Sequence, residues 1–259
     1  MSGVSERYRE AWESYWRATS DAPGEAIWDA DPSLSAVRDV DRLAPHADLS
    51  LPIVDLGCGN GTQTRYLATR FGRALGVDLS HAAVEHARRA DTARAVAEFR
   101  QLSLTDPAAV HELHERLGDV NVYMRAVIHQ SDAPDRRPVA EAVATLVGRR
   151  GRGFVAELTE ESKTTLARLA ETPGGPPLKL RRVFDHDLRP ADAGDVEVRE
   201  LLAAAGLRIL AEGPTALAQT EQWADGSRVE LPARWFVVGR APEGGGRLST
   251  GVVRPPHSA

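Results

Sequence analysis

The chain has 259 residues, of which 42% are hydrophobic and 27% charged, a composition typical of a globular protein with a full apolar core. Its formal net charge of -5 argues against a nucleic-acid-binding surface, and its single cysteine excludes an internal disulfide and a cysteine-based zinc site. The first residues contain no apolar signal core, and no segment reaches the roughly twenty apolar residues that span a membrane. We therefore expect a cytoplasmic protein that contacts neither nucleic acid nor a membrane.

The first predicted element is an aromatic helix. Tyr8, Trp12, Tyr15 and Trp16 recur at helical spacing ahead of any strand-like segment. Aromatic side chains at this spacing more often dock a helix onto a core than bind a ligand, and both interpretations stay open here. As a ligand-binding element, this helix would be a flap whose rings enclose a small molecule and attract a cation. We predict an N-terminal helical lid over residues 1–48.

Residues 49–240 show the pattern of an α/β protein with a mainly parallel sheet, because short apolar runs alternate with longer helical segments. The predicted strands are 51–56, 73–78, 97–102, 119–125, 153–158, 207–212 and 233–239. No helix is evident between the last two, where residues 215–232 are predicted as an extended excursion. We expect those two strands to pair antiparallel.

The stretch VDLGCGNGT, residues 54–62, follows the first predicted strand and would open the next helix. Gly57, Gly59 and Gly61 would let a ligand approach the backbone, where a helix N-terminus offers unpaired N–H groups. Asp78 ends the next strand, at a place where a carboxylate can accept hydrogen bonds from both hydroxyls of a ribose. The implied ligand is a nucleoside. NAD is disfavoured, since the third glycine stands one place early for the dinucleotide fingerprint.

The two runs VDLGCGNGTQTRYLATRF and ALGVDLSHAAVEHARRA closely resemble the class I S-adenosylmethionine-dependent methyltransferases. The resemblance is strong over about residues 50–160 and weaker up to 240. It implies a Rossmann-like, doubly wound α/β sheet of seven strands, mostly parallel, whose antiparallel last strand lies beside the fifth. It also implies S-adenosylmethionine as the cofactor.

The resemblance assigns roles to individual positions. Asp55 and the glycines would surround the methionine part of the cofactor, Asp78 would bind the ribose, and Leu79 would pack against the adenine. Cys58, inside the motif, is predicted to be a small packing residue rather than a reactive thiol. The residues expected at the cofactor are Asp55, Gly57, Cys58, Gly59, Gly61, Asp78, Leu79, Ser103, Leu104 and Arg125.

The adenine contact is a departure from the family pattern. Many members carry an Asp after the third strand to meet the adenine amino group, whereas this chain reads QLSL at residues 101–104. Ser103 and Asp106 are the two candidate substitutes.

The fourth predicted strand ends in VYMRAVIHQ, and the carboxyl ends of strands line the ligand crevice in open α/β sheets. His129 is the best-placed histidine for catalysis, because imidazole titrates near neutrality and could take a proton from a hydroxyl acceptor. Substrate orientation and a purely structural role are its alternatives. Arg125 is assigned to a cofactor or substrate carboxylate, with a salt bridge as the alternative. The other helix-borne histidine pairs are expected on exposed faces: His81 with His86, and His111 with His114.

Two further segments are predicted to shape the acceptor pocket. Trp28, in EAIWDAD, faintly resembles the segment with which small-molecule methyltransferases close over their cofactor. Residues 159–195 are predicted to be a substrate-lid insertion, in which TPGGPP breaks a helix and opens an irregular passage through LRRVFDHDLRP. The expected substrate contacts are Tyr8, Trp12, Tyr15, Trp28 and His186.

The run Asp185-His186-Asp187 carries metal-capable side chains, but adjacent residues point in different directions, so we predict no metal site there. Residues 241–259, rich in Gly and Pro, are predicted to be a disordered tail.

These observations favour methyl transfer to a small organic acceptor at an oxygen atom, in bacterial secondary metabolism. No NPPY-like sequence, the family sign of amino methylation on nucleic acid or protein, follows the fourth strand. Two alternatives stay open: an enzyme that retains the cofactor while catalysing another reaction such as cyclisation, and a noncatalytic binding module. A homodimer is left open as the oligomeric state.

Overall fold

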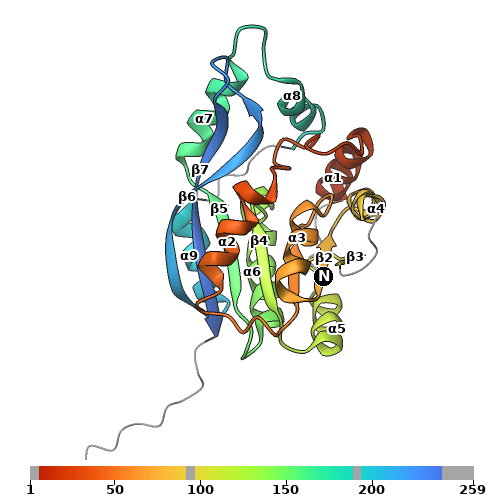
Figure 1. Cartoon of the computed structure of the whole chain (residues 1–259), viewed down its shortest axis with the longest axis vertical. Helices are drawn as coiled ribbons and strands as arrows, with labels where there is room; N and C mark the ends of the chain where they lie inside the picture. The colour runs from red at the N-terminus through yellow and green to blue at the C-terminus, as the bar shows by residue number, and fades with distance from the viewer. Residues whose placement is uncertain (1–5, 92–96, 189–193, 241–259) are drawn as a thin grey trace, which may run out of the picture.

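The computed structural model describes residues 6–91, 97–188 and 194–240, and it centres on a seven-stranded sheet (Figure 1). The strands are β1 Ile53–Leu56, β2 Ala74–Asp78, β3 Ala97–Gln101, β4 Asn121–Arg125, β5 Gly153–Leu158, β6 Leu207–Gln222 and β7 Arg228–Arg240. Their order in the sheet is β3-β2-β1-β4-β5-β7-β6. The pairs among β1 to β5 are parallel, and β7 runs antiparallel to both β5 and β6. This confirms the predicted α/β fold, including the last strand beside the fifth.

Helices cover both faces of the sheet, which is why β1 and β5 are buried along their whole length. One apolar core joins the sheet to α2 (Ala36–Leu43) and α3 (Thr62–Phe71), and it also includes residues of α1 (Glu6–Ala18), α7 (Glu161–Ala170) and α8 (Leu178–Asp185). The other core joins the sheet to α5 (Pro107–Leu117), α6 (Ala133–Val147) and α9 (Asp195–Ala204). Helix α4 spans His81–Ala90, and short 3₁₀ turns lie at Pro32–Leu34 (η1) and Ile128–Gln130 (η2).

The last two strands pair antiparallel, as predicted, but they are longer than predicted and form one hairpin, so most of residues 215–232 belong to the strands and not to an excursion between them. Pairing runs from Leu207 with Arg240 to Gln222 with Arg228, with irregular register at two places. Gly226, at a φ of 81°, closes the turn after Asp225. An Asp-Gly pair between alternating segments is a hairpin signal that sequence reasoning passed over. Strands β6 and β7 therefore extend past the carboxyl end of β5 and carry side chains beyond that edge of the sheet.

The segment after β5 is more regular than predicted. The passage LRRVFDHDLRP begins as helix α8, in which Leu180 and Val183, one turn apart, are both buried. The prediction of an irregular passage is wrong for residues 180–185, because apolar residues at helical spacing dock this turn onto the core. Arg189 and Pro190, at the end of the passage, lie outside the described residues. Arg182 of α8 donates a hydrogen bond to the carbonyl of Glu25, which links this segment to the chain after α1.

Helix α1 docks on α4 through polar and aromatic contacts. The Glu13 carboxylate accepts hydrogen bonds from the Ser80 hydroxyl (2.7 Å) and the Ala82 backbone N–H (3.1 Å) at the start of α4. His86 is buried, its Nδ1 lies 2.8 Å from Asp21, and its ring lies on Trp16. The prediction of an exposed His86 is therefore wrong, because α1 covers that face of α4.

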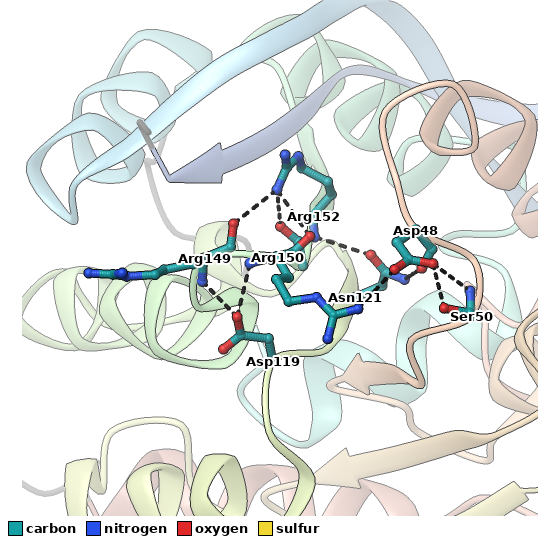
Figure 2. Close-up of polar contacts among 8 residues, drawn as sticks. Asp48, Ser50, Asp119, Asn121, Arg149, Arg150 and Arg152 are labelled. Carbon is teal, nitrogen blue, oxygen red and sulfur yellow. Dashed lines mark hydrogen bonds and ion pairs between the residues drawn. The ribbon is translucent and has the colours of Figure 1, made fainter. Parts of the chain in front are cut away.

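Polar contacts fix the amino-terminal ends of β4 and β5 (Figure 2). Asp78 and Arg125 lie at the carboxyl ends of their strands, at the other edge of the sheet. Asp119 accepts the backbone N–H groups of Arg149 and Arg150, and Arg150 also forms an ion pair with Asp48. Arg152 donates one N–H to the carbonyl of Gly151, and its own backbone N–H binds Asn121. The side chains of Arg150 and Arg152 are thus engaged within the chain.

Candidate functional site

A cavity of about 200 Å³ lies at the carboxyl ends of the central strands and under helix α1. Because successive parallel strands all end at one edge, residues distant in sequence meet there. Thirteen of the predicted site residues line it: Tyr8, Trp12, Trp28, Asp55, Gly57, Cys58, Gly59, Asp78, Leu79, Ser103, Leu104, Arg125 and His129.

Three predicted site residues lie outside the cavity lining. Gly61 faces β3 and α4, where an added Cβ would come within 2.5 Å of Phe99. Tyr15 is fully buried among Trp12, Trp16 and Trp28, which place it in the core of the lid. The Nδ1 atom of His186 lies 2.8 Å from the Ser14 hydroxyl, so His186 makes a docking contact between the end of α8 and α1.

The glycine loop is shaped for close approach. Gly59 has a φ of 54°, and its backbone N–H donates to Asp78 Oδ2 at 2.9 Å. An added Cβ at Gly59 would come within 2.8 Å of the Trp16 ring, and glycine avoids this clash. The loop is therefore held between the Asp78 carboxylate on one side and the Trp16 ring on the other.

The Asp78 carboxylate is fixed at the cavity wall. Its Oδ1 accepts the Ser80 backbone N–H at 2.9 Å, while Oδ2 accepts that of Gly59. Burial raises the pKa of Asp78 to about 6, and the nearby Glu13 carboxylate adds to this effect. A carboxylate in this position can accept hydrogen bonds from ligand hydroxyls, and such bonds favour its ionised form.

Asp55 lies deeper, at the end of β1. Its Oδ2 accepts a hydrogen bond from Thr64 Oγ1 at 2.6 Å, and burial raises its pKa to about 7. A cationic ligand group beside Asp55 would favour ionisation of this carboxyl. Cys58 is buried next to it, and burial raises the pKa of its thiol, which fits a packing role.

An apolar slot lies beyond Asp78. Val77, Leu79, Leu102 and Leu104 line it, and Ser103 faces it while hydrogen-bonded to Thr105. Asp106, the second candidate for an adenine contact, instead caps α5 by accepting the N–H groups of Ala108 and Ala109. The slot therefore offers apolar walls for a flat base and one hydroxyl, next to a carboxylate suited to a ribose. These residues fit the nucleoside part of S-adenosylmethionine.

His129 is held by a carboxylate that sequence reasoning missed. Its Nδ1 lies 2.7 Å from Oε2 of Glu157, and the two side chains are 2% and 0% exposed. Glu157 also accepts the backbone N–H groups of Val127, Ile128 and His129. These bonds fix Nδ1 as the protonated nitrogen and leave Nε2, 3.1 Å from the amide nitrogen of Gln130, as an acceptor. The available signal was an acid at the carboxyl end of β5.

Arg125 projects from the end of β4 on the face that carries Tyr123. Burial lowers the pKa of its guanidinium, but Tyr123, Asp39 and Asp55 together raise it above its ordinary value. Its Nε atom is buried without a hydrogen-bond partner. Arg125 therefore stays charged and keeps an unused donor at the cavity.

The rest of the cavity is mostly apolar and comes from distant segments. Tyr8, Trp12 and Trp28 cover it from the N-terminal side, with Trp12 and Trp28 in edge-to-face contact at 5.5 Å. The lining also includes three leucines and one buried glutamine that sequence reasoning missed: Leu158, Leu217, Leu231 and Gln219. Three of them lie on the β6–β7 hairpin, whose length was not predicted.

Comparison with known proteins identifies the domain. Residues 53–151 match the family model described as Methyltransferase domain. A solved structure of a SAM-dependent methyltransferase from Anabaena variabilis ATCC 29413 superposes with a TM-score of 0.84 at 28% identity, covering 93% of this chain and 98% of that one. Residues 53–151 therefore belong to a class I S-adenosylmethionine-dependent methyltransferase domain. S-adenosylmethionine is its cofactor, as the sequence predicted.

Two more distant structures share the fold of this methyltransferase domain. Magnesium protoporphyrin IX methyltransferase from Synechocystis PCC 6803, with bound SAH, has a TM-score of 0.54 at 17% identity over 81% of this chain and 82% of that one. A structure described for the conversion of a disulfide bond into a thioacetal group during echinomycin biosynthesis gives 0.68 at 20% identity, over 92% and 94%. None of the curated proteins compared with the chain matches it.

The described residues of this methyltransferase contain no group of three or more His, Cys, Asp or Glu side chains that could hold a metal ion. Asp187 forms an ion pair with Arg7, and His186 contacts Ser14, so these neighbours point to α1. Among the helices of the described ranges, none is long and apolar enough to cross a membrane.

Proposed function

We propose that the chain transfers the methyl group of S-adenosylmethionine to a small organic acceptor at an oxygen atom. One observation carries the proposal: Asp78, Gly59 and His129 line a single cavity, and His129 is held there by Glu157 behind it. The cavity holds about 200 Å³ and is covered by aromatic side chains, which suits a small molecule better than a polymer. We place the reaction in bacterial secondary metabolism, in keeping with the arginine-rich, lysine-poor composition and the aromatic lid.

His129 is the proposed general base. With Nδ1 donating to Glu157, Nε2 carries the lone pair that can accept a proton from an acceptor hydroxyl. An acceptor hydroxyl would replace the Gln130 amide, which now lies 3.1 Å from Nε2. Glu157 fixes the ring orientation and stabilises the imidazolium formed when the proton arrives. The sulfonium of S-adenosylmethionine supplies an electrophilic methyl group when bound.

The remaining residues position and shield the reactants. Asp78 and the apolar slot hold the nucleoside, and Asp55 lies where it can meet a cationic group of the methionine part. Tyr8, Trp12 and Trp28 exclude water and bring the acceptor into line with the methyl group, which accounts for most of the work that such a transfer requires.

The proposal is tested first by calorimetric titration of the purified protein with S-adenosylmethionine. We expect saturable binding that Asp78→Ala weakens by at least about tenfold, while Asp41→Ala, an exposed control on α2, leaves it unchanged. A screen of small hydroxylated molecules with a deuterated methyl donor then detects transfer by mass spectrometry.

Each contrary outcome has a distinct meaning. Tight cofactor binding with conversion of a molecule but no methyl loss would favour the cofactor-retaining enzyme, and absent binding by the folded protein would favour the noncatalytic module. Methylation of RNA or protein but of no small molecule would refute the proposed acceptor class.

A further inference from the structure

Arg125 is the cation of the cavity. Within residues 6–91, 97–188 and 194–240, no other arginine or lysine lines it. Arg125 ends β4 and pairs in register with Ala156 of β5, on the side of the sheet away from the strands β2 and β3 that flank the nucleoside slot. Arg125 therefore lies two strands away from β2 and beside β1, whose Asp55 interacts electrostatically with the guanidinium.

The carboxylates near Arg125 are already committed to other donors. Asp39 Oδ2 accepts the Tyr123 hydroxyl at 2.8 Å, and Asp39 Oδ1 lies 3.3 Å from Nη1 of Arg42. Asp55 accepts from Thr64. None of the described carboxylates forms an ion pair with Arg125. The charged guanidinium is thus held in place by its surroundings and yet keeps the buried Nε–H without an acceptor, a state that costs free energy unless a ligand supplies one.

The walls around this donor favour an apolar ligand body. Leu158, Leu217 and Leu231 line the cavity, as do the aromatic side chains of Tyr8, Trp12, Trp16 and Trp28. The acidic side chains Asp55 and Asp78 suit a cationic cofactor and repel an anion, and Asp55 also interacts electrostatically with Arg125. An anionic group in this cavity is therefore most stable beside Arg125.

We infer that the methyl acceptor is an aromatic or apolar organic acid whose carboxylate binds Arg125, while its hydroxyl meets His129. This inference rests on the proposed function and deepens it by naming the acceptor class. A planar guanidinium can donate two parallel hydrogen bonds to a carboxylate, which gives orientation as well as affinity. Arg125 is then a residue that determines specificity rather than one that carries out the transfer.

The test compares acids with their uncharged analogues. The probes are 4-hydroxybenzoate and 4-hydroxycinnamate, each beside its carboxamide, titrated calorimetrically with and without S-adenosylhomocysteine. In the wild type we expect at least one acid to bind about tenfold or more tightly than its amide. Arg125→Met should abolish this preference and Arg125→Lys should retain part of it, whereas the exposed control Arg137→Met should behave as wild type.

Two results would overturn the inference. The first is a wild type with no preference for any acid over its amide. The second is an Arg125→Met variant that binds S-adenosylhomocysteine much more weakly but 5′-methylthioadenosine normally, which would assign Arg125 to the cofactor's own carboxylate. If Arg125→Met fails to fold, Arg125→Lys decides on the same measurements. Failure of the wild type to bind S-adenosylmethionine would instead strike the proposed function, because the acid-over-amide comparison is also made without cofactor.

Discussion

The indole ring of Trp16 lies directly against Gly59: an added Cβ at Gly59 would come within 2.8 Å of Cζ2 of Trp16. Trp16 belongs to the N-terminal helix and Gly59 to the loop that we propose holds the cofactor, so the helix and this loop share one packed contact. Trp16 also contacts His86 and Trp28, which fixes its position from two sides. The shape of the cofactor site therefore depends on the docking of α1.

This contact predicts the effect of Gly59→Ala. The positive φ of 54° costs an alanine about 1–2 kcal/mol, and the clash with Trp16 adds to it. We expect S-adenosylmethionine binding to weaken at least about tenfold, since the loop or the lid must move. The matched control is Gly72→Ala, with a φ of 70° and no atom near its added Cβ, which should lose stability alone and keep its affinity. Calorimetry and urea unfolding measure both; equal effects at the two positions would contradict the coupling.

Glu13 is predicted to hold helix α1 against the start of α4. Burial raises the pKa of its carboxyl, but hydrogen bonds from Ser80 and Ala82 and the charge of Arg17 lower it overall, so the ionised form is the one that docks α1. Glu13→Ala should free the helix and increase tryptic cleavage at its arginines several-fold, with a stability loss of about 1–2 kcal/mol. Glu10→Ala, on an exposed position of the same helix, is the control. Unchanged cleavage in Glu13→Ala would show that the aromatic contacts suffice.

His129→Gln tests the proposed base. The substitution should lower the rate of methyl transfer about 10²–10⁴-fold, because no group then accepts the acceptor's proton. The dissociation constant for S-adenosylmethionine should stay within about twofold of wild type, since the cradle residues are separate from His129. Single-turnover kinetics and calorimetry give the two values. If His129→Gln transfers methyl groups at the wild-type rate, His129 is not the general base and its role is structural.

Glu157→Gln is predicted to destabilise the fold. Glu157 is fully buried and accepts hydrogen bonds from the His129 ring and from the backbone N–H groups of Val127, Ile128 and His129. A glutamine offers one oxygen and places an NH₂ group against donors, which should cost about 2–4 kcal/mol in the free energy of unfolding. Glu141→Gln, in an exposed pair with Arg137, should cost less than about 0.5 kcal/mol. Similar losses for the two variants would mean that the buried network is not what stabilises this loop.

The raised pKa of Asp55 leads us to expect that the stability of the cofactor-free protein depends on pH. Its pKa of about 7 in the folded state lies above the value of about 3.9 for an unfolded chain. The folded state therefore holds the proton more tightly, so the contribution of Asp55 is complete below about pH 4 and is lost as the pH rises towards 7. In urea unfolding, the free energy of unfolding should fall less steeply with rising pH for Asp55→Asn than for the wild type. At pH 8 we expect the free energy of unfolding of Asp55→Asn to exceed that of the wild type by about 1–3 kcal/mol. Asp41→Asn should keep the wild-type slope, and a wild-type slope in Asp55→Asn would refute the assignment.

The sequence alone determined the fold class and the cofactor. Strands β1 and β2, the glycine loop and Asp78 form a local unit, because a strand, a tight turn and a helix N-terminus lie within a few residues of one another. Periodicity also located the helix of Tyr8 to Trp16, because residues three or four positions apart in the sequence lie on the same face of a helix. Such features need no knowledge of distant segments.

Only the tertiary structure decided which side chains share the cavity. Glu157 is one acid among many in the sequence, and its meeting with His129 depends on β4 and β5 being neighbours in the sheet. Leu217, Gln219 and Leu231 reach the cavity because the β6–β7 hairpin rises beyond the sheet edge, and Tyr15 and His186 are drawn into lid contacts instead. Side-chain partners across long sequence separations are set by packing of whole elements, which no local pattern records.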